Sequence, residues 1–230
     1  MRSLAAFLSV MFALTAVPLS AQSIVYEEVT YTWVEVDGAH LEGGSERFVS
    51  SQAARIPQGL AAYGPFRVLD EGRAALVDVT DTRSPEAFRA MLRDFPGIGM
   101  IEMIECPGTE DDTANLLLGR MIRARGLATY VPAGGSVRSG AVELFLAGAR
   151  RIASPGAEFA VHAWLDDTGR EATDYAASDP ENAKYIAYYR QMGMSAAEAA
   201  AFYAMTNSVP HSEARWFDAA QLGLWVRLDG

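Results

Sequence analysis

Short apolar runs alternate with amphipathic stretches along the chain from about residue 74. Residues 75–79, 100–105 and 128–132 are mostly apolar runs of strand length. In the stretches between them, apolar residues recur every three or four positions, as on one face of a helix. These residues are Phe88, Met91, Leu92 and Phe95 in the first stretch and Ala114, Leu117, Leu118, Met121 and Ile122 in the second. Such alternation predicts an α/β domain with parallel strands and right-handed crossovers.

Local signals mark where further helices begin. Ser84-Pro85 and Asp179-Pro180 each combine a capping residue with a proline suited to the first helical turn. Ser195 and Glu198 have the spacing of a capping box. Residues 139–149 are apolar nearly all round, which predicts a buried central helix. A turn at Pro155-Gly156 and a strand over residues 158–164 follow it.

The region before residue 74 has a different pattern. Residues 24–26 and 30–36 are rich in β-branched and aromatic residues, and Asp37-Gly38 is a hairpin signal. We therefore predict an N-terminal β extension, including a β-hairpin, over residues 22–73. The α/β domain is predicted to span residues 74–230.

The first 21 residues have the composition of a secretory signal peptide. Arg2 precedes an apolar run over residues 4–17, and Ala21 offers a small residue for cleavage. An N-terminal membrane anchor is the alternative, but this run is shorter than the roughly 20 residues that a spanning helix needs. We expect residues 1–21 to be removed and the mature protein to be periplasmic or secreted, with no membrane association after cleavage.

Composition narrows the partners and cofactors. The 230 residues are 50% hydrophobic, enough for a substantial core, and 19 basic against 29 acidic residues give a net charge of −10. Such a charge disfavours nucleic acid and anionic membrane surfaces as partners. Cys106 is the single cysteine, so no internal disulfide can form, and the three histidines are not spaced as metal ligands. We predict no metal and no cofactor.

A glycine-rich turn supplies the main candidate for catalysis. Residues 134–140 lead from a strand to the buried helix and deliver Ser139 to its beginning, where free amides favour a developing oxyanion. A serine nucleophile needs a base, and His162 near the end of a strand is the histidine placed to serve. The alternative is structural: Ser139 as a helix N-cap and His162 as a core residue. Aromatic residues at helical spacing indicate packing in preference to a ligand-binding surface, with a subunit interface as a further alternative; they are Tyr185, Tyr188, Tyr189, Phe202 and Tyr203.

Several motifs occur in a set order between residues 75 and 225. They are Cys106-Pro107-Gly108-Thr109, Ile122-Arg123-Ala124-Arg125-Gly126-Leu127, Val131, Ser139, Gly148 with Arg150, Ala160-Val161-His162, and the tail over residues 216–224. This series resembles the proteolytic subunit of Clp protease and crotonase-like proteins, and especially exported Clp-protease-like proteins. The resemblance implies a spiral of repeated β-β-α units with a parallel sheet, a last helix in the tail, and assembly into homo-oligomers.

The resemblance also assigns roles to individual residues. It makes Ser139 the nucleophile and His162 the general base, and it places the oxyanion hole at the amides of Gly140 and of the Gly108-Thr109 loop. This sequence departs from the family at two positions. Thr109 replaces a glycine, and a β-branched residue resists positive φ. His211 stands where the family has an acid.

The third member of the triad therefore stays open. The candidates to orient His162 are His211, Glu213, Asp166, Asp167, Asp218 and a backbone carbonyl. Lys184, the single lysine, would allow a Ser–Lys dyad, although we expect it on an exposed helix face.

Two hypotheses about function follow. The first is an exported serine hydrolase, a peptidase in preference to an esterase, acting on a peptide or other acyl substrate. The second is a catalytically degenerate Clp-protease-like binding or assembly module, which the departures at Thr109 and His211 favour.

Overall fold

The computed structural model describes residues 53–229. The predicted signal peptide and the predicted hairpin around Asp37-Gly38 lie outside these residues. Within them, no helix combines the length and apolar character needed to cross a bilayer.

The larger of the two sheets in the fold has six strands. Its order is β1 (Ala61–Tyr63), β2 (Phe66–Val68), β3 (Arg73–Leu76), β4 (Met100–Met103), β6 (Ala128–Val131) and β8 (Arg151–Ala153). Strands β3, β4, β6 and β8 are parallel, whereas β1, β2 and β3 form an antiparallel meander. The last part of the predicted N-terminal extension, through β1 and β2, thus pairs with the strands of the α/β domain.

The smaller sheet has four strands. Its order is β10 (Arg215–Asp218), β9 (Glu158–Val161), β7 (Ser136–Arg138) and β5 (Glu105–Cys106). Strands β5, β7 and β9 are parallel, and β10 is antiparallel to β9. The tail that we expected to form only a last helix therefore contributes an edge strand first, and a short helix, α7 (Ala219–Leu222), follows it.

The apolar run over residues 100–105 is two strands in different sheets rather than one. The Ile104 amide donates to Leu76 O of the first sheet at 3.0 Å, and Ile104 O accepts from the Ser136 amide of the second at 2.9 Å. The chain thus crosses from one sheet to the other at Ile104. An apolar run alone carries no mark of such a crossing, because its residues are buried on both sides of it.

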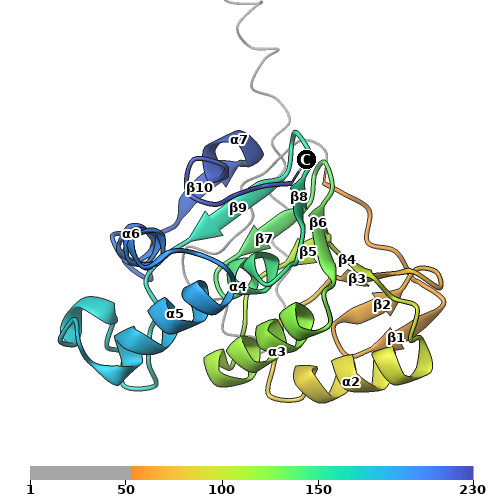
Figure 1. Ribbon diagram of the computed structural model, residues 1–230, viewed down its shortest axis with the longest axis horizontal. Helices are drawn as coiled ribbons and strands as arrows, with labels where there is room; N and C mark the ends of the chain where they lie inside the picture. Colours follow the sequence, from red (N-terminus) through yellow and green to blue (C-terminus); the bar gives the residue numbers. More distant parts are fainter. Residues whose placement is uncertain (1–52, 230) are drawn as a thin grey trace, which may run out of the picture. The chain divides into compact units, whose positions relative to one another are not determined.

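The two sheets are linked by a repeated β-β-α unit. Strands β4 and β5 are followed by α3 (Asp112–Ala124), and β6 and β7 are followed by α4 (Ala141–Leu146). Strands β8 and β9 repeat the same pair (Figure 1). In each unit the first strand joins the six-stranded sheet and the second joins the four-stranded sheet. The predicted α/β fold, a β-β-α spiral with mostly parallel strands, is confirmed.

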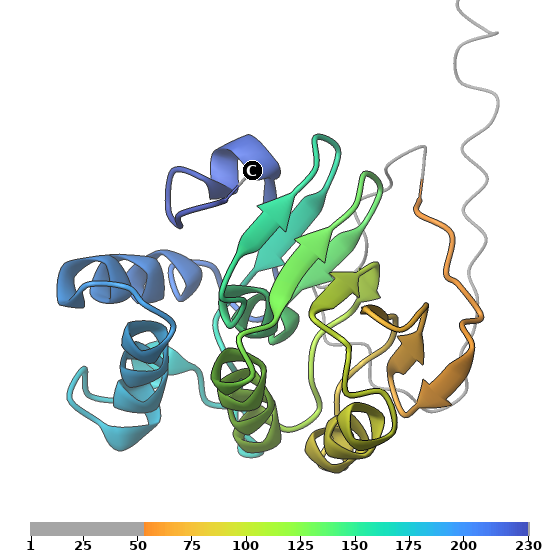
Figure 2. The same ribbon diagram turned by 45° about the vertical axis from the view of Figure 1, so that its right-hand side comes forward.

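The remaining helices begin where the sequence predicts. Helix α2 (Ser84–Asp94) and helix α5 (Pro180–Gln191) both have proline in the first turn, and Asp179 caps α5 as predicted. The predicted cap at Ser84 is wrong, because Ser84 is the first helical residue and Arg83 holds the N-cap position without a side-chain hydrogen bond. Ser195 and Glu198 form the predicted capping box of α6 (Ala196–Thr206). A 3-10 helix, η1 (Ala172–Asp174), precedes α5. Figures 1 and 2 show α2 and α3 side by side along the six-stranded sheet, and α5 packs on α6.

The core surrounds α4, all six residues of which are buried. Its Phe145 ring lies 5.0 Å from that of Phe159 on β9. On α3 one prediction is wrong, because Leu117 is 41% exposed. The buried face of α3 instead includes Leu116 and Gly119, where a Cβ would overlap the Tyr188 hydroxyl. The close approach of Tyr188 sets the rotation of α3, and this contact is invisible in the helix's own periodicity.

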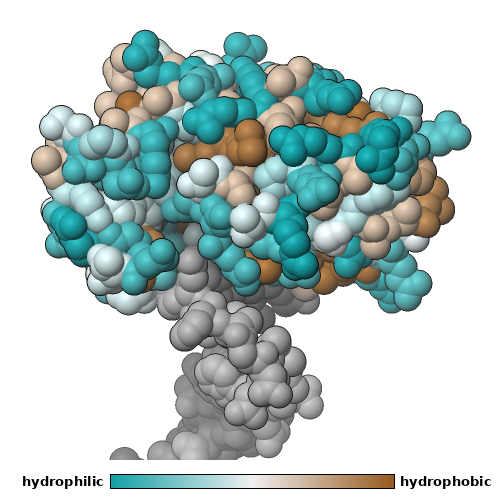
Figure 3. Space-filling model, turned by 90° about the horizontal axis from the view of Figure 1, so that it is seen from below, coloured by the Kyte–Doolittle hydropathy of each residue, from teal (hydrophilic) through white to brown (hydrophobic). Residues whose placement is uncertain are grey.

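Exposed apolar residues are dispersed. Among residues 53–229, the large ones are Ile56, Leu60, Leu117, Leu165, Leu224 and Trp225. On the face shown in Figure 3, apolar residues form separate groups between hydrophilic ones. Assembly into homo-oligomers stays a prediction.

Candidate active site

Ser139 occupies a strained turn between β7 and α4. Its φ is +49°, and it is the one non-glycine residue within 53–229 with a positive φ. Such a conformation costs about 1–3 kcal/mol and persists where the surrounding structure enforces it. Here the Ser139 amide donates to Ala160 O at 2.9 Å, and Ser139 O accepts from the Val142 amide at 2.9 Å. The N-cap position of α4 belongs to Gly140, so Ser139 does not serve as a simple helix cap.

His162 follows β9, the parallel neighbour of β7. Because Arg138 pairs with Ala160, Ser139 and His162 emerge at the same edge of the four-stranded sheet. Both residues line one pocket, and Thr109, Gly140 and His211 line it with them. The fold thus brings together residues that are far apart in the sequence and that the sequence predicted for one site.

A backbone carbonyl orients the His162 ring. His162 is 9% exposed, and its Nδ1 lies 2.9 Å from Ala163 O. A carbonyl oxygen only accepts, so Nδ1 carries the hydrogen and Nε2 is the nitrogen able to take a proton. The tautomer is therefore the one a general base requires. A backbone carbonyl was one of the alternatives predicted for the third member of the triad, which orients His162.

His211 lies beside His162 in the pocket. The two ring centroids are 4.7 Å apart and the rings are perpendicular. The His211 amide donates to Glu171 Oε1 at 2.9 Å, which holds the segment before β10 in place. The residue reached by counting along the motif thus lies beside His162, and its side chain is an imidazole.

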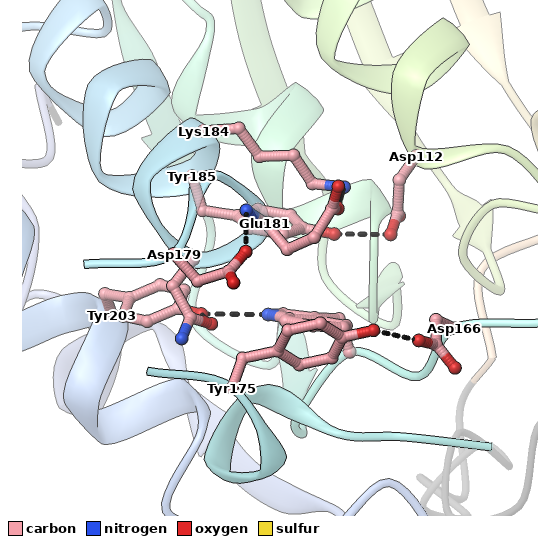
Figure 4. A network of polar contacts seen from close by, with 10 residues as sticks. Asp112, Asp166, Tyr175, Asp179, Glu181, Lys184, Tyr185 and Tyr203 are labelled. Carbon is pink, nitrogen blue, oxygen red and sulfur yellow. Dashed lines mark hydrogen bonds and ion pairs between the residues drawn. The ribbon is translucent and has the colours of Figure 1, made fainter. Parts of the chain in front are cut away.

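The four carboxylates predicted as alternatives lie outside the pocket lining. Tyr175, Thr168 and Arg170 donate to Asp166, and the Tyr175 hydroxyl above all holds the pKa of that carboxyl well below its usual range (Figure 4). Asp218 accepts from the Gln221 amide as the cap of α7. Asp167 and Glu213 are exposed.

The loop before α3 supplies backbone donors next to Ser139. Gly108 adopts φ +143°, whereas Thr109 has no positive φ, so the expected conflict at Thr109 does not arise. A Cβ added at Gly108 would lie 3.0 Å from Ser139 Cβ and 3.4 Å from its Oγ. Within the described part of the chain, the amides of Thr109 and Gly140 donate no hydrogen bond. Two donors beside a serine hydroxyl are the elements of an oxyanion hole.

Two buried side chains brace these donors, and neither has a sequence signal. The Thr80 amide donates to Gly108 O at 3.1 Å, and the Thr80 hydroxyl donates to Asn115 Oδ1 at 3.0 Å. Asn115 Nδ2 in turn donates to Gly140 O at 2.6 Å. Thr80 and Asn115 are each 1% exposed. They connect the Gly108 loop to the turn that carries Ser139.

A buried ion pair fixes the strand that ends at Ser139. Arg138 Nη1 lies 2.7 Å from Glu105 Oε1 and donates to Ser136 Oγ at 2.7 Å. The Arg138 side chain is only 6% exposed, so solvent screens this pair weakly. The pair joins β5 and β7, the strands that lead to Gly108 and to Ser139.

Acidic and aromatic residues complete the pocket lining. Burial raises the pKa of Asp112, on α3, and raises that of Glu143, on α4, to about 7. Tyr185 donates to Asp112, and Tyr189 donates to Glu143 Oε1 at 2.7 Å. The predicted packing role of the aromatic residues is confirmed, since Tyr185 and Tyr189 are buried in the core. Their place in the pocket was not predicted.

The alternative Ser–Lys chemistry finds no support in the geometry. Lys184 pairs with Glu181 at 2.5 Å and is not part of the pocket lining, so a Ser–Lys dyad is not formed. Cys106 is buried, and burial raises the pKa of its thiol. Among residues 53–229, no group of three or more histidine, cysteine or acidic side chains is arranged to hold a metal ion.

Comparisons with known proteins identify similar folds. No protein-family model matches the sequence, and no curated protein does. One similar solved structure is a mutant of ClpP1 from Listeria monocytogenes, with 14% identity over 68% of this chain and 88% of the other, at a TM-score of 0.49. Another is a mutant of the 1510-N membrane-bound stomatin-specific protease in complex with a substrate peptide. It has 14% identity over 66% and 73% of the two chains, at a TM-score of 0.41.

Proposed function

We propose that this protein is a serine hydrolase, a peptidase of the Clp-protease type of fold, with Ser139 as nucleophile and His162 as general base. The observation that carries the proposal is the strained Ser139, held at φ +49° in the pocket that His162 also lines. A half-buried, strained serine that shares a pocket with an oriented imidazole has no evident structural purpose, whereas a nucleophile on a tight turn is a recurring catalytic device.

The proposed reaction uses each of these groups once in acylation. Ser139 Oγ attacks the carbonyl carbon of the substrate while His162 Nε2 takes the hydroxyl proton. The amides of Thr109 and Gly140 donate to the oxyanion that forms. The bond to the leaving amine then breaks and the amine receives the proton from His162. In deacylation, water attacks the acyl carbon while His162 Nε2 takes a proton from it. The ester bond to Ser139 Oγ then breaks, and Ser139 receives that proton.

A fluorophosphonate probe tests the nucleophile directly. Wild-type protein lacking residues 1–21 should be labelled covalently, because the phosphonyl group traps an activated serine. Ser139→Ala should abolish labelling, and His162→Ala should slow it by at least about a hundredfold. Ser178→Ala, at an exposed serine outside the pocket lining, is the matched control. Absence of labelling in folded wild type, or labelling that survives Ser139→Ala, contradicts the proposal.

The second candidate function is a non-catalytic binding or assembly module. The observation that favours it is the partner of His162 Nδ1, which is a carbonyl oxygen in place of a carboxylate, with an imidazole at the acid position. A module of this kind would bind a peptide in the pocket and leave it intact. Wild type and Ser139→Ala would then bind peptides equally, and neither would release product.

Export and assembly are further parts of the proposal. We propose that residues 1–21 direct secretion and are cleaved after Ala21, which N-terminal sequencing of protein recovered from a periplasmic fraction would test. An N-terminus at Met1 would contradict it. Assembly into homo-oligomers is tested by light scattering on the mature chain, for which a monomeric mass at micromolar concentration is the contrary result.

A further inference from the structure

The pocket that contains Ser139 is lined by two acidic side chains, and the basic residues of its described lining are the histidines His162 and His211. Asp112 and Glu143 contribute carboxyl groups, and the described lining includes neither lysine nor arginine. Because Glu143 is buried and Asp112 is half-buried, these groups act through a lower effective dielectric than at the surface. A positively charged group entering here is attracted, and an anionic one is repelled.

Aromatic faces accompany the two carboxyl groups. The Trp164 and Tyr185 rings stack at 6.1 Å, and those of Tyr185 and Tyr203 stack at 6.0 Å. All three residues line the pocket. Lys184 Nζ lies 5.2 Å from the Tyr185 ring centroid and 5.9 Å from that of Trp164. These rings therefore already hold one cation next to the pocket, at distances typical of cation–π contacts.

The aromatic residues and the two carboxyl groups form one wall of the pocket. The side-chain hydrogen-bond donors of these aromatic residues already have acceptors. The Tyr185 hydroxyl donates to Asp112, as Figure 4 shows, and the Tyr189 hydroxyl donates to Glu143. Trp164 donates to the Tyr203 hydroxyl, which donates to Asn182.

The unfilled capacity of the wall is for accepting hydrogen bonds. Asn207 lines the pocket, and its buried Oδ1 accepts no hydrogen bond from the described residues. The carboxylates of Asp112 and Glu143 have further lone pairs. A ligand that fits this wall must therefore bring donors of its own.

We propose that the pocket binds the ammonium or guanidinium group of a lysine or arginine side chain in a peptide substrate. Asp112 and Glu143 accept its hydrogen bonds, and the rings of Trp164 and Tyr185 provide the cation–π surface. The placement of this basic residue next to the bond that Ser139 attacks rests on the proposed function. The preference for a cation does not, because it follows from the lining alone.

Binding is measured first without catalysis. Acetylated and amidated pentapeptides with a central lysine, arginine, norleucine or glutamate are titrated calorimetrically into mature Ser139→Ala protein. We expect the lysine and arginine peptides to bind at least about tenfold more tightly than the norleucine peptide. A norleucine peptide with a free N-terminal amine is the control for the position of the cation. It should bind no more tightly than the acetylated norleucine peptide if the pocket recognises a side-chain cation. Equal affinity for the lysine and norleucine peptides overturns the proposal.

Variants then locate the cation. In the Ser139→Ala background, Asp112→Asn and Glu143→Gln should each lower lysine-peptide affinity about tenfold and leave norleucine-peptide affinity unchanged. Glu71→Gln, at an exposed glutamate outside the pocket, makes the same change in charge and serves as the control. Lys184→Met removes the resident cation and should tighten lysine-peptide binding about threefold. An equal loss in Glu71→Gln, or none in both pocket variants, contradicts the proposal.

Fluorophosphonate labelling separates the two proposals. If the protein is not labelled but prefers the lysine peptide, the cation-binding proposal stands and the hydrolase proposal is wrong. If it is labelled at Ser139 but binds lysine and norleucine peptides equally, the hydrolase proposal stands and the cation-binding proposal is wrong. If both hold, the rate of peptide cleavage should show the same preference for a basic side chain.

Discussion

At the scale of single residues, the candidate site depends on backbone conformations that few side chains tolerate. Ser139 at φ +49° and Gly108 at φ +143° face each other, and a Cβ at Gly108 would lie 3.0 Å from Ser139 Cβ. This contact would involve two Cβ atoms, which are fixed to the backbone and cannot move aside as the end of a long side chain can. The position of the nucleophile is thus coupled to the absence of a side chain at Gly108.

Gly108→Ala should impair both stability and labelling. The left-handed conformation costs an alanine about 1–3 kcal/mol, and the new methyl group displaces Ser139. Gly126→Ala is the matched control, because Gly126 has φ +66° but nothing within 4 Å of its would-be Cβ. Urea unfolding should show a loss in both variants, whereas fluorophosphonate labelling should slow at least about tenfold only in Gly108→Ala. Equal labelling rates in the two variants would contradict the coupling.

Glu143 should make stability depend on pH. Burial raises its pKa to about 7 in the folded protein, so the folded state binds more protons than the unfolded state between pH 4.5 and 7. The free energy of unfolding therefore falls as pH rises through this interval, by about 3 kcal/mol in total. Glu143→Gln removes this dependence, while its amide oxygen can still accept from Tyr189.

The measurement is urea unfolding at about pH 5 and about pH 8. The difference in free energy of unfolding, Glu143→Gln minus wild type, should become more positive by about 3 kcal/mol between the two pH values. Exposed Glu71→Gln should track wild type within about 0.5 kcal/mol. Parallel pH profiles for Glu143→Gln and wild type would show that Glu143 keeps an ordinary pKa in the folded protein.

Single residues were predictable from the sequence where local chemistry marks them. Ser139 stands in a glycine-rich turn before an apolar helix, and His162 follows a strand, so both could be selected. Glu143 had a weak signal, as the one charged residue within the apolar stretch over 139–149. Asp112 and Asn207 had none, because an acid in the first turn of a helix and an amide at its end are usual at the surface. Tertiary packing makes them pocket residues.

At the scale of elements, helix α3 connects the two loops that carry the candidate oxyanion donors. Asn115 on this helix donates to Gly140 O at 2.6 Å and accepts from Thr80, which in turn donates to Gly108 O. The helix is thus a brace between the Gly108 loop and the Ser139 turn. Its start was predictable from Asp111, which caps it, but its rotation was not, as the exposed Leu117 shows.

Asn115→Ala should loosen this brace. It removes the hydrogen bonds that Asn115 donates to the Gly140 carbonyl and accepts from the Thr80 hydroxyl, which costs about 1–3 kcal/mol, and it frees the Gly140 amide to move. Leu118→Ala, at a fully buried position of the same helix, should cost about 2–5 kcal/mol by leaving a cavity. Fluorophosphonate labelling of folded protein should slow at least tenfold in Asn115→Ala and by less in Leu118→Ala. A slower rate in Leu118→Ala than in Asn115→Ala would assign the effect to stability alone.

At the scale of the whole molecule, the end of the chain closes the fold. Val226 is buried in the core, and Asp229 returns to β8, where its amide donates to Arg151 O at 2.7 Å and its Oδ2 accepts from the Arg151 amide at 3.0 Å. Asp229 thus supplies hydrogen-bond partners for the Arg151 backbone on β8, which is an edge strand of the six-stranded sheet. The resemblance to the Clp-protease family implied the β-β-α order of the fold, but no sequence pattern indicated this contact, which joins residues 78 positions apart.

Asp229→Ala should therefore destabilise the whole domain. The substitution removes the acceptor of a partly buried backbone amide and should lower the free energy of unfolding by about 1–2 kcal/mol. Arg227→Ala is the control, because Arg227 is 87% exposed and its nitrogen lies 3.7 Å from the same carboxylate, a surface pair worth well under about 1 kcal/mol. Hydrogen exchange gives a second readout: the Arg151 amide should exchange faster in Asp229→Ala and at the wild-type rate in Arg227→Ala. Equal effects of the two substitutions would mean that the surface ion pair, and not the backbone contact, holds the terminus on β8.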